Sequence, residues 1–484
     1  MNKISPKSMI ITVVELLISI LSISSYSLWT DEGIRLHAIV FGNLKDVIHY
    51  GLADKQLFFV LKQYFWTSLF GISEIATRSL NLVFVCLVIY YLNLILDKKG
   101  IDISYGLVLF ISPMFVYYMN DAGPYIILLA YSFAFLYYVF YTDQFNSKKN
   151  VFMINLIFLL GIGTHFIFGF VYLIYLVKVI YVTYQKKLKF KTHFLIGLAF
   201  SPVYLTLLTF YLQAIESGAS RGWEPPTIMN GLFILYSFMG MSGLSLSRNE
   251  IRAGHFETIQ WHQIVLPGLL LLLMLGVFLL AVKYRKQIIK PNRLLLIGTF
   301  VYCLVFYLFS YKWHFHFWER HFIMAYAVFI LLLIEVFSQL SKQKSVKILL
   351  SLICLLFFIS SLQLRLNPYY GKDNYKDAID YVLSSPKRIV LYQGDWKVSN
   401  YYGIDALSFK DYQNKNGNNQ LFNVIDIRNK TAKEIQKIIE NYPEEDILIV
   451  FNEKYDEHLV LKAFMKDKSY EKQIYNTFTI FEIK

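Results

Sequence analysis

Long apolar runs, each close to the length of a membrane-crossing helix, recur along most of the chain. A helix needs roughly 20 residues to cross about 30 Å of hydrocarbon, at 1.5 Å per residue. We predict eleven crossings, at residues 8–27, 78–96, 103–119, 125–142, 151–163, 166–183, 193–212, 264–283, 294–310, 321–339 and 346–364. Because only Thr164 and His165 separate the fifth and sixth runs, these two are expected to form a tight hairpin.

The hydrophobic pattern changes after residue 364 to that of a soluble domain of about 120 residues. The runs "RIVLY" and "DILIVF" predict buried strands, and "TAKEIQKIIENY" has apolar positions at helical spacing. The last residues, "YEKQIYNTFTIFEIK", predict a hairpin or an edge strand. We therefore assign residues 1–364 to a membrane domain and residues 365–484 to an α/β domain.

Two of the connections between predicted crossings are long, at residues 28–77 and 213–263. The first contains "QLFFVLKQYFWTSLFG", an apolar segment interrupted by Lys62, which favours a helix lying along the membrane interface. The second contains "SRGWEPPTIMNGLF", where two prolines break a helix and Trp223 suits a membrane surface. We expect both connections to be structured caps on the outer face.

Composition supports this interpretation, because 56% hydrophobic and 18% aromatic residues among 484 exceed the usual content of a soluble protein. The net charge of +13 comes largely from short basic segments in every second connection, from "MNKISPK" to "SKQKSVK". Since basic loops stay in the cytoplasm, the N-terminus is predicted to be cytoplasmic and the α/β domain extracytoplasmic. The scattered charge argues against nucleic-acid binding. Cleavage of the first run as a signal peptide would invert this pattern, so we favour a retained crossing. A bacterial cytoplasmic (inner) membrane is the expected location.

Polar residues gather at the predicted outer ends of the crossings, and these places are Asp31-Glu32, Asp54, Asp121, His165 and Arg320. Each has a simple structural interpretation. Acidic residues at a water boundary, an aspartate capping a helix, a histidine in a turn and an arginine at an interface are all ordinary. Their convergence on one face of the membrane, from distant parts of the sequence, favours a functional site.

Several motifs, in their order along the chain, resemble those of the GT-C membrane glycosyltransferases. They are "WTDE", "SEIATRSLNLVF", "SPMFVYYMNDAGPYIILLAYSFAFLYYVF", "GTHFIFGFVYLIY", "WERHFIMAYAVFILLL" and "NYKDAIDYV". This group includes bacterial protein mannosyltransferases and lipid A aminoarabinose transferases, and is glycosyltransferase family 39-like. The resemblance implies a GT-C fold of about 11 transmembrane helices with an extracytoplasmic α/β domain. It also implies that a polyprenyl-phosphate-linked sugar is transferred to a lipid, glycan or protein acceptor.

The resemblance also implies roles for the acidic pair and for one cation, Arg320. Asp31 matches the general base that takes the proton of the acceptor, and Glu32 would orient it, bind the acceptor or help to hold a metal. Arg320 matches the arginine that neutralises the phosphate of the donor. Lys55 stands where relatives have a proline and would supply a second cation. His321 replaces the usual tyrosine after Arg320.

Four more residues match positions near the donor. Asp54, Asp121 and Tyr125 would contact the substrate, and Asp121 and His165 are the candidate ligands of a divalent cation. Where many relatives have an arginine two residues after the second acid, this chain has Gly123. These departures bear on which sugar is transferred.

Two other functions fit some of the same features. A transporter or flippase of lipid-linked sugars would need ionisable residues through the middle of the membrane, whereas these residues cluster at the outer ends. A polysaccharide polymerase or ligase would use a similar lipid-linked donor and transfer a longer glycan. The sequence alone leaves this last alternative open.

Overall fold

The computed structural model describes residues 6–216, 225–248, 251, 260–315, 317–341, 343–371, 373–385, 389–393, 395–402, 423–427, 432–443, 447–452, 470–475 and 478–483. The chain divides into two compact units. The first, the helical unit, comprises Met1–Ser24, Leu44–Leu246 and Glu257–Leu366. The second, the α/β unit, comprises Ser25–Asn43, Ser247–Phe256 and Asn367–Lys484.

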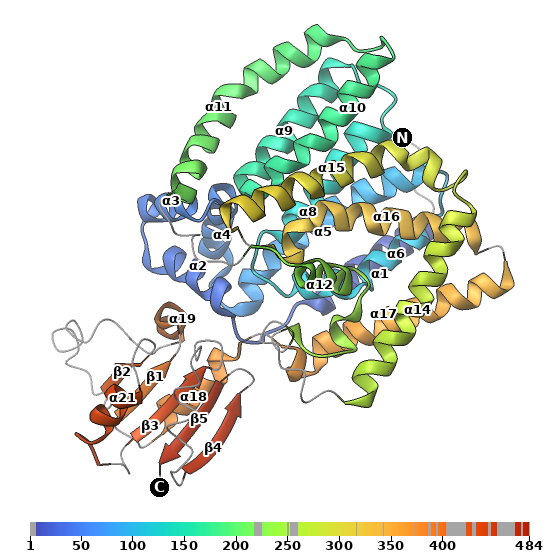
Figure 1. Ribbon diagram of the computed structural model, residues 1–484. Helices are drawn as coiled ribbons and strands as arrows, with labels where there is room; N and C mark the ends of the chain where they lie inside the picture. Colours follow the sequence, from blue (N-terminus) through green and yellow to red (C-terminus); the bar gives the residue numbers. More distant parts are fainter. Residues whose placement is uncertain are drawn as a thin grey trace. The chain divides into compact units, whose positions relative to one another are not determined.

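Long apolar helices dominate the helical unit (Figure 1). Seven helical segments in the described part of the chain are long and apolar enough to cross a membrane. They are α5 (Glu74–Lys98), η3 (Phe166–Val171) with α10 (Tyr172–Tyr184), α11 (Phe190–Glu216), α14 (Trp261–Lys283), α15 (Ile289–Trp313), η5 (Glu319–Phe322) with α16 (Ile323–Leu340), and α17 (Lys344–Leu366). They coincide with seven of the eleven predicted crossings, and the chain is an integral membrane protein.

The other four predicted runs form shorter or broken helices. They are α1 (Pro6–Ser22), the series η1 (Ile103–Gly106), α6 (Leu107–Phe110) and α7 (Pro113–Met119), the pair α8 (Tyr125–Leu136) and η2 (Tyr137–Tyr141), and α9 (Lys148–Thr164). The third run breaks because Pro113 occupies the first turn of α7, where its missing N–H costs nothing. The fourth run ends in a π-helical turn, η2.

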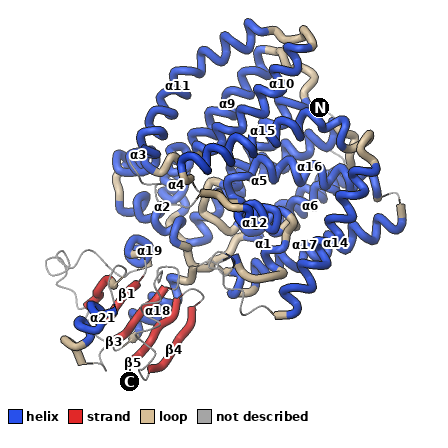
Figure 2. The backbone as a smooth tube through the Cα atoms, in the orientation of Figure 1, coloured by secondary structure: helices blue, strands red, loops and turns tan. Residues whose placement is uncertain are grey.

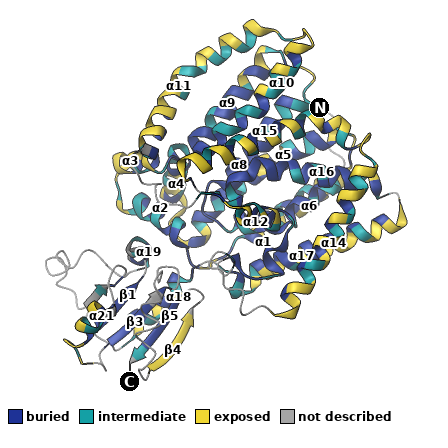
Figure 3. Cartoon of the chain, viewed as in Figure 1, coloured by how far each residue is buried: buried dark blue, intermediate teal, exposed yellow. Residues whose placement is uncertain are grey.

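Helix α8 lies at the centre of the helical unit and contacts α5, α9 and α16 (Figure 3). Every residue of α8 is buried, so its side chains face protein on all sides. By contrast, α11 and α14 expose large apolar side chains along most of their length, Phe194, Leu198, Leu272 and Phe278 among them. We expect these exposed faces to contact membrane lipid.

Short helices occupy the two long connections. The first contains α3 (Leu44–Ala53) and α4 (Leu57–Phe70), and the second contains α12 (Ile228–Phe238) and η4 (Met241–Gly243). The predicted helix in "QLFFVLKQYFWTSLFG" is confirmed as α4, which buries Phe59 and Val60 and exposes Leu69 and Phe70. Trp223, for which we predicted a membrane-surface position, lies outside the described residues.

A largely buried ion pair links the end of α5 to α15 and α16 in the helical unit. Lys99 Nζ lies 2.8 Å from Glu335 Oε2 on α16, and Asn292 on α15 donates to the same oxygen at 2.7 Å. The side chains of Lys99 and Glu335 are 13% and 8% exposed. The pair is therefore shielded from water, and each charge depends on the other.

Replacing Glu335 with alanine is expected to destabilise the folded protein by about 3–5 kcal/mol, because it leaves the Lys99 ammonium without its counter-charge. Thermal unfolding in detergent measures the effect. The matched control is Asp143→Ala, which breaks the exposed Lys98–Asp143 pair nearby and should change the midpoint little. Equal shifts in the two variants would contradict the prediction.

In its described residues, the α/β unit contains a five-stranded sheet with the strand order β2-β1-β3-β5-β4 (Figure 2). The strands are β1 (Ile389–Gln393), β2 (Asn423–Asp426), β3 (Ile447–Asn452), β4 (Tyr470–Tyr475) and β5 (Phe478–Ile483). β1 pairs in parallel with β2 and β3, whereas β5 pairs antiparallel with β3 and β4. The remaining elements are α2 (Thr30–Phe41), η6 (Pro368–Tyr370), α18 (Tyr375–Ser384), α19 (Trp396–Tyr401) and α21 (Ala432–Ile439).

Two apolar clusters cover the two faces of this sheet. Val390 and Leu448 pack with α18 on one face, whereas Leu391 and Ile449 pack with α21 on the other. Burial on both faces explains why β1 and β3 are continuous apolar runs. The α/β class is confirmed, with both predicted strands and the C-terminal hairpin, while β2 was not predicted.

Candidate active site

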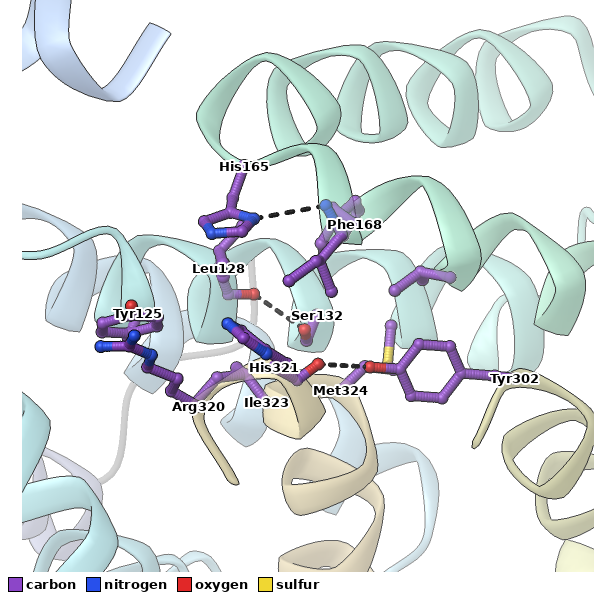
Figure 4. A pocket seen from close by; sticks show the side chains of 12 residues that line it. Tyr125, Leu128, Ser132, His165, Phe168, Tyr302, Arg320, His321, Ile323 and Met324 are labelled. Atoms are coloured by element: carbon purple, nitrogen blue, oxygen red, sulfur yellow. Dashed lines mark hydrogen bonds between the residues drawn. The ribbon is translucent and has the colours of Figure 1, made fainter. Parts of the chain in front are cut away.

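A pocket opens in the helical unit between η3, α8, α15 and η5 with the start of α16 (Figure 4). Its enclosed cavity is small, about 10 Å³, which is room for about one water molecule. The residues that line it are Tyr125, Leu128, Ser132, His165, Ile167, Phe168, Val171, Tyr302, Arg320, His321, Ile323 and Met324. A largely apolar wall with a few polar groups is typical of a small-molecule site.

Arg320 is the cation of this pocket and lies in the short helix η5. Its guanidinium carbon is 5.9 Å from the centre of the Tyr125 ring at the start of α8, and Figure 4 shows the two side chains against each other. The preceding residue, Glu319, is 1% exposed and accepts a hydrogen bond from the Tyr118 hydroxyl at 2.9 Å. The rings of Tyr118 and Tyr125 are 4.8 Å apart. Two packed tyrosines therefore hold the Glu319-Arg320 pair in place.

His165 lies across the pocket, at the turn between α9 and η3. Its Nδ1 accepts a hydrogen bond from the Ile167 N–H at 3.3 Å, which assigns the proton of the neutral ring to Nε2. The His165 ring lies 5.9 Å from that of His321, whose carbonyl accepts a bond from the Tyr302 hydroxyl at 2.7 Å. His165 is therefore arranged to donate a hydrogen bond through Nε2.

Lys55 lies in the turn after helix α3 and has an unusual backbone conformation. It has a φ of 60°, the left-handed conformation that glycine usually adopts after a helix. Its carbonyl accepts a hydrogen bond from the Phe166 N–H at 3.2 Å, which fastens this turn to the His165 turn. Burial lowers the pKa of the Lys55 ammonium, and the charge of Asp54 opposes this shift. Neither Asp54 nor Lys55 is among the residues that line the pocket.

Asp121 is buried at the turn that precedes α8, with 1% of its surface exposed. The Asn81 side chain donates to its carbonyl oxygen at 2.8 Å. A Cβ atom at Gly123 would lie 2.6 Å from Asp121 Oδ1. Gly123 therefore gives the carboxylate its space, and an arginine there would require Asp121 to move.

The described residues do not form a metal centre. No group of three or more histidine, cysteine, aspartate or glutamate side chains within the described ranges could hold a metal ion. The hydrogen bond to Nδ1 of His165 also favours a protonated Nε2, whereas a ligand through Nε2 needs the opposite tautomer. The role of Asp121 and His165 as ligands of a divalent cation stays a prediction.

The acidic pair lies in the α/β unit, at the start of α2. Glu32 is fully buried and its Oε2 accepts a hydrogen bond from the Trp29 N–H at 3.0 Å, as expected of the third residue of a helix. Asp31 is half-buried, and its carbonyl accepts a bond from Arg35 Nε at 2.8 Å. Glu32 therefore caps the helix, whereas Asp31 has the more accessible carboxylate.

The structure gathers three of the predicted site residues, Tyr125, His165 and Arg320, around one pocket. It also shows a half-buried lysine near the His165 turn, Lys62, for which the sequence analysis predicted no role in a site. Lys62 Nζ donates to Thr164 Oγ1 at 2.9 Å and lies 5.3 Å from the centre of the Tyr131 ring. Desolvation lowers its pKa to about 8. The signal in the sequence was a single lysine in an apolar helical segment.

No protein-family model matches the chain, and no curated protein matches it. Among solved structures, ArnT from Cupriavidus metallidurans bound to undecaprenyl phosphate superposes with a TM-score of 0.51 at 11% sequence identity. The match covers 98% of this chain and 97% of that chain. ArnT from the same organism in the apo state gives a TM-score of 0.49, also at 11% identity, with 98% and 97% covered. The chain therefore has a GT-C-type fold, that of the lipid-bound ArnT structure, as the order of its motifs predicted.

Proposed function

We propose that the chain is a membrane glycosyltransferase that transfers a sugar from a polyprenyl-phosphate donor to a lipid, glycan or protein acceptor. The observation that carries the proposal is the pocket formed by Arg320, Tyr125 and His165. The related fold of ArnT, whose structure contains undecaprenyl phosphate, supports it. Because a fold hosts many functions, the chemistry of these side chains carries the argument.

The proposed reaction exchanges one bond of the sugar for another. The bond between the anomeric carbon and the phosphate oxygen breaks, and a bond to the acceptor oxygen or nitrogen forms. The acceptor proton passes to a general base, and polyprenyl phosphate leaves with the bonding electron pair. Because this phosphate is a stable anion, a cation can replace the general acid that a glycosidase needs.

In the helical unit, Arg320 is the proposed ligand of the donor phosphate. A guanidinium keeps its charge at every relevant pH and presents several N–H donors to phosphate oxygens. The Tyr125 ring beside it restricts its position. The Nε2–H of His165 and the ammonium of Lys55 are the further proposed donors, and Asp54, Asp121 and Tyr125 are proposed to contact the sugar.

In the α/β unit, Asp31 is the proposed general base. A carboxylate can take the acceptor proton as the new bond forms. Glu32 is proposed to orient Asp31, because the Glu32 carboxylate caps the first turn of α2. No step is assigned to a divalent cation.

Lys55 gives the proposed donor binding a pH dependence. Phosphate binding needs the ammonium form, and the lowered pKa means that Lys55 loses its proton at a lower pH than an ordinary lysine. The affinity for the donor is therefore expected to fall as the pH rises through this lowered pKa. Lys55→Arg should move the fall to higher pH, because arginine stays charged.

The donor KM, measured against pH, tests this expectation. Lys45→Arg, at an exposed position of α3, is the matched control and should leave the profile unchanged. An identical alkaline fall in wild type and Lys55→Arg would remove Lys55 from the donor site.

The deciding experiment uses purified protein and a panel of polyprenyl-phosphate sugars, with a lipid, a glycan or a peptide as acceptor. We expect release of polyprenyl phosphate together with a glycosylated acceptor, and the same assay with a chelator tests the predicted divalent cation. Movement of intact lipid-linked sugar across vesicles without its cleavage would favour a flippase. Transfer of a preformed glycan would favour a polymerase or ligase. No cleavage of any donor would overturn the proposal.

The proposed orientation places the N-terminus in the cytoplasm of a bacterial cell and the α/β unit outside its cytoplasmic membrane. It rests on the basic connections of the sequence, since short positive loops are retained inside. Labelling of single cysteines with a membrane-impermeant reagent tests it. A cysteine at the exposed Asp380 should react from outside, and one at the exposed Lys286 only after lysis.

A further inference from the structure

The start of α2 is held by residues that lie hundreds of positions later in the sequence, all within the α/β unit. The Leu28 N–H donates to the Tyr402 hydroxyl at 2.7 Å. The Lys376 N–H donates to Ser27 Oγ at 3.1 Å. The segment that leads into α2 is therefore tied to the beginning of α18 and to the end of α19.

A buried side-chain hydrogen bond continues this attachment up to the residue before Asp31. Thr30 Oγ1 donates to Asp373 Oδ2 at 2.7 Å, and the Tyr375 hydroxyl lies 3.3 Å from the same Thr30 oxygen. Thr30 and Asp373 are 5% and 4% exposed, and Tyr375 is fully buried. A hydrogen bond to a charged group shielded from water is worth more than an ordinary one.

The first turn of α2 also packs closely on α19. A Cβ atom at Gly33 would lie 2.7 Å from both methyl carbons of Val398, which is fully buried. Glycine at this position therefore lets the helix approach α19 more closely than any other residue would. Hydrogen bonds of the residues before Asp31 and the Gly33–Val398 contact after it therefore fix the position of Asp31 within the α/β unit.

We propose that Asp373 is a positioning residue that sets the place of the Asp31 carboxylate through Thr30. The C-terminal segment of the α/β unit thereby holds the first turn of α2, and with it the proposed general base, in position. We call this set of contacts the mount of Asp31. The consequence for catalysis rests on the proposed function, whereas the mount itself rests only on these contacts.

The size of the expected effect follows from the geometry of proton transfer. The accepting atom of a general base lies about 2.6–3.2 Å from the atom that carries the proton. A misplacement of about 1 Å lowers the rate of a reaction by roughly a hundredfold. Loss of the Thr30–Asp373 bond should therefore reduce kcat by about tenfold to a hundredfold. The KM for the donor should stay unchanged, because Asp373 is not proposed to contact the donor.

The test compares Asp373→Ala and Thr30→Val, which remove the bond, with Asp373→Asn and Thr30→Ser, which keep an acceptor and a hydroxyl. Asp380→Asn, at an exposed position of helix α18, which follows Asp373, is the matched control. Each variant is purified at full length, and kcat, donor KM and the thermal midpoint are measured. We expect the first two variants to lose kcat, the two conservative variants to recover most of it, and the control to match wild type.

Hydrogen–deuterium exchange of the amides at residues 27–36 supplies a readout that needs no activity. Exchange there should rise in Asp373→Ala and Thr30→Val and stay at the wild-type level in Asp373→Asn. This measurement tests the mount even if the chain transfers no sugar. Failure of the proposed function can therefore be told apart from failure of this inference.

Two outcomes would overturn the inference. The first is unchanged exchange and unchanged kcat in both bond-removing variants. The second is an Asp373→Asn variant as impaired as Asp373→Ala, which would mean that the charge matters and not the hydrogen bond. A combined Thr30→Val and Asp373→Ala variant should have about the same kcat as either single variant, because each substitution removes the same interaction.

Discussion

Asp31→Asn should lower the kcat of sugar transfer by about 10²–10⁴-fold, which is the usual contribution of general-base catalysis. Asparagine has nearly the same shape as aspartate but accepts no proton at neutral pH. Since Asp31 is half-buried at the first turn of α2, the substitution leaves the buried contacts of this helix in place. The thermal midpoint and the donor KM should therefore stay close to those of wild type. Steady-state rates of polyprenyl phosphate release measure the effect.

Glu32 provides the matched control for this experiment, because it is the neighbouring carboxylate with a different environment. Glu32→Gln keeps an oxygen that can accept the Trp29 N–H, so the cap of α2 and most of the activity should persist. Glu32→Ala removes the cap and should cost about 1 kcal/mol of stability. If Asp31→Asn retained near-normal kcat while Glu32→Gln lost it, the roles of the two acids would be exchanged.

Much of the membrane part was predictable, because a helix in lipid must satisfy its own backbone and so needs a long apolar run. The runs that became α5, α11 and α14 are of this kind. The run at 103–119 was predicted as one crossing, although Pro113 marks the place where it breaks. The packing of short helices around α8 cannot be obtained from hydropathy, since a fully buried helix and a lipid-facing one have similar composition.

The candidate site, too, could be predicted only in part from the sequence. The order of motifs singled out Tyr125, His165 and Arg320, and the structure places all three around one pocket, although their roles stay predictions. The tautomer of His165 and the left-handed conformation of Lys55 depend on contacts with Ile167 and Phe166 that no local pattern indicates.

The least predictable feature is the place of the acidic pair. The sequence suggested that Asp31 and Glu32 simply follow the first crossing, but they begin a separate helix, α2, that belongs to the α/β unit. Thr30 and Asp373, which fasten this helix, are 343 residues apart in the chain. Contacts of such long range arise only when the C-terminal segment has folded, and a single sequence contains no sign of them.

Arg320→Ala is expected to reduce kcat/KM for the donor by about 10²–10³-fold, the usual cost of removing one group that stabilises developing charge. The loss should appear in kcat as well as in KM, because the negative charge on the phosphate grows as the sugar leaves. Arg320→Lys keeps a charge but has no fork of N–H donors, so an intermediate rate is expected. Arg285→Ala, at an exposed position between α14 and α15, is the matched control and should behave as wild type. Donor kinetics of the four proteins decide the matter, and an Arg320→Ala enzyme with wild-type kcat and KM would exclude Arg320 from the phosphate site.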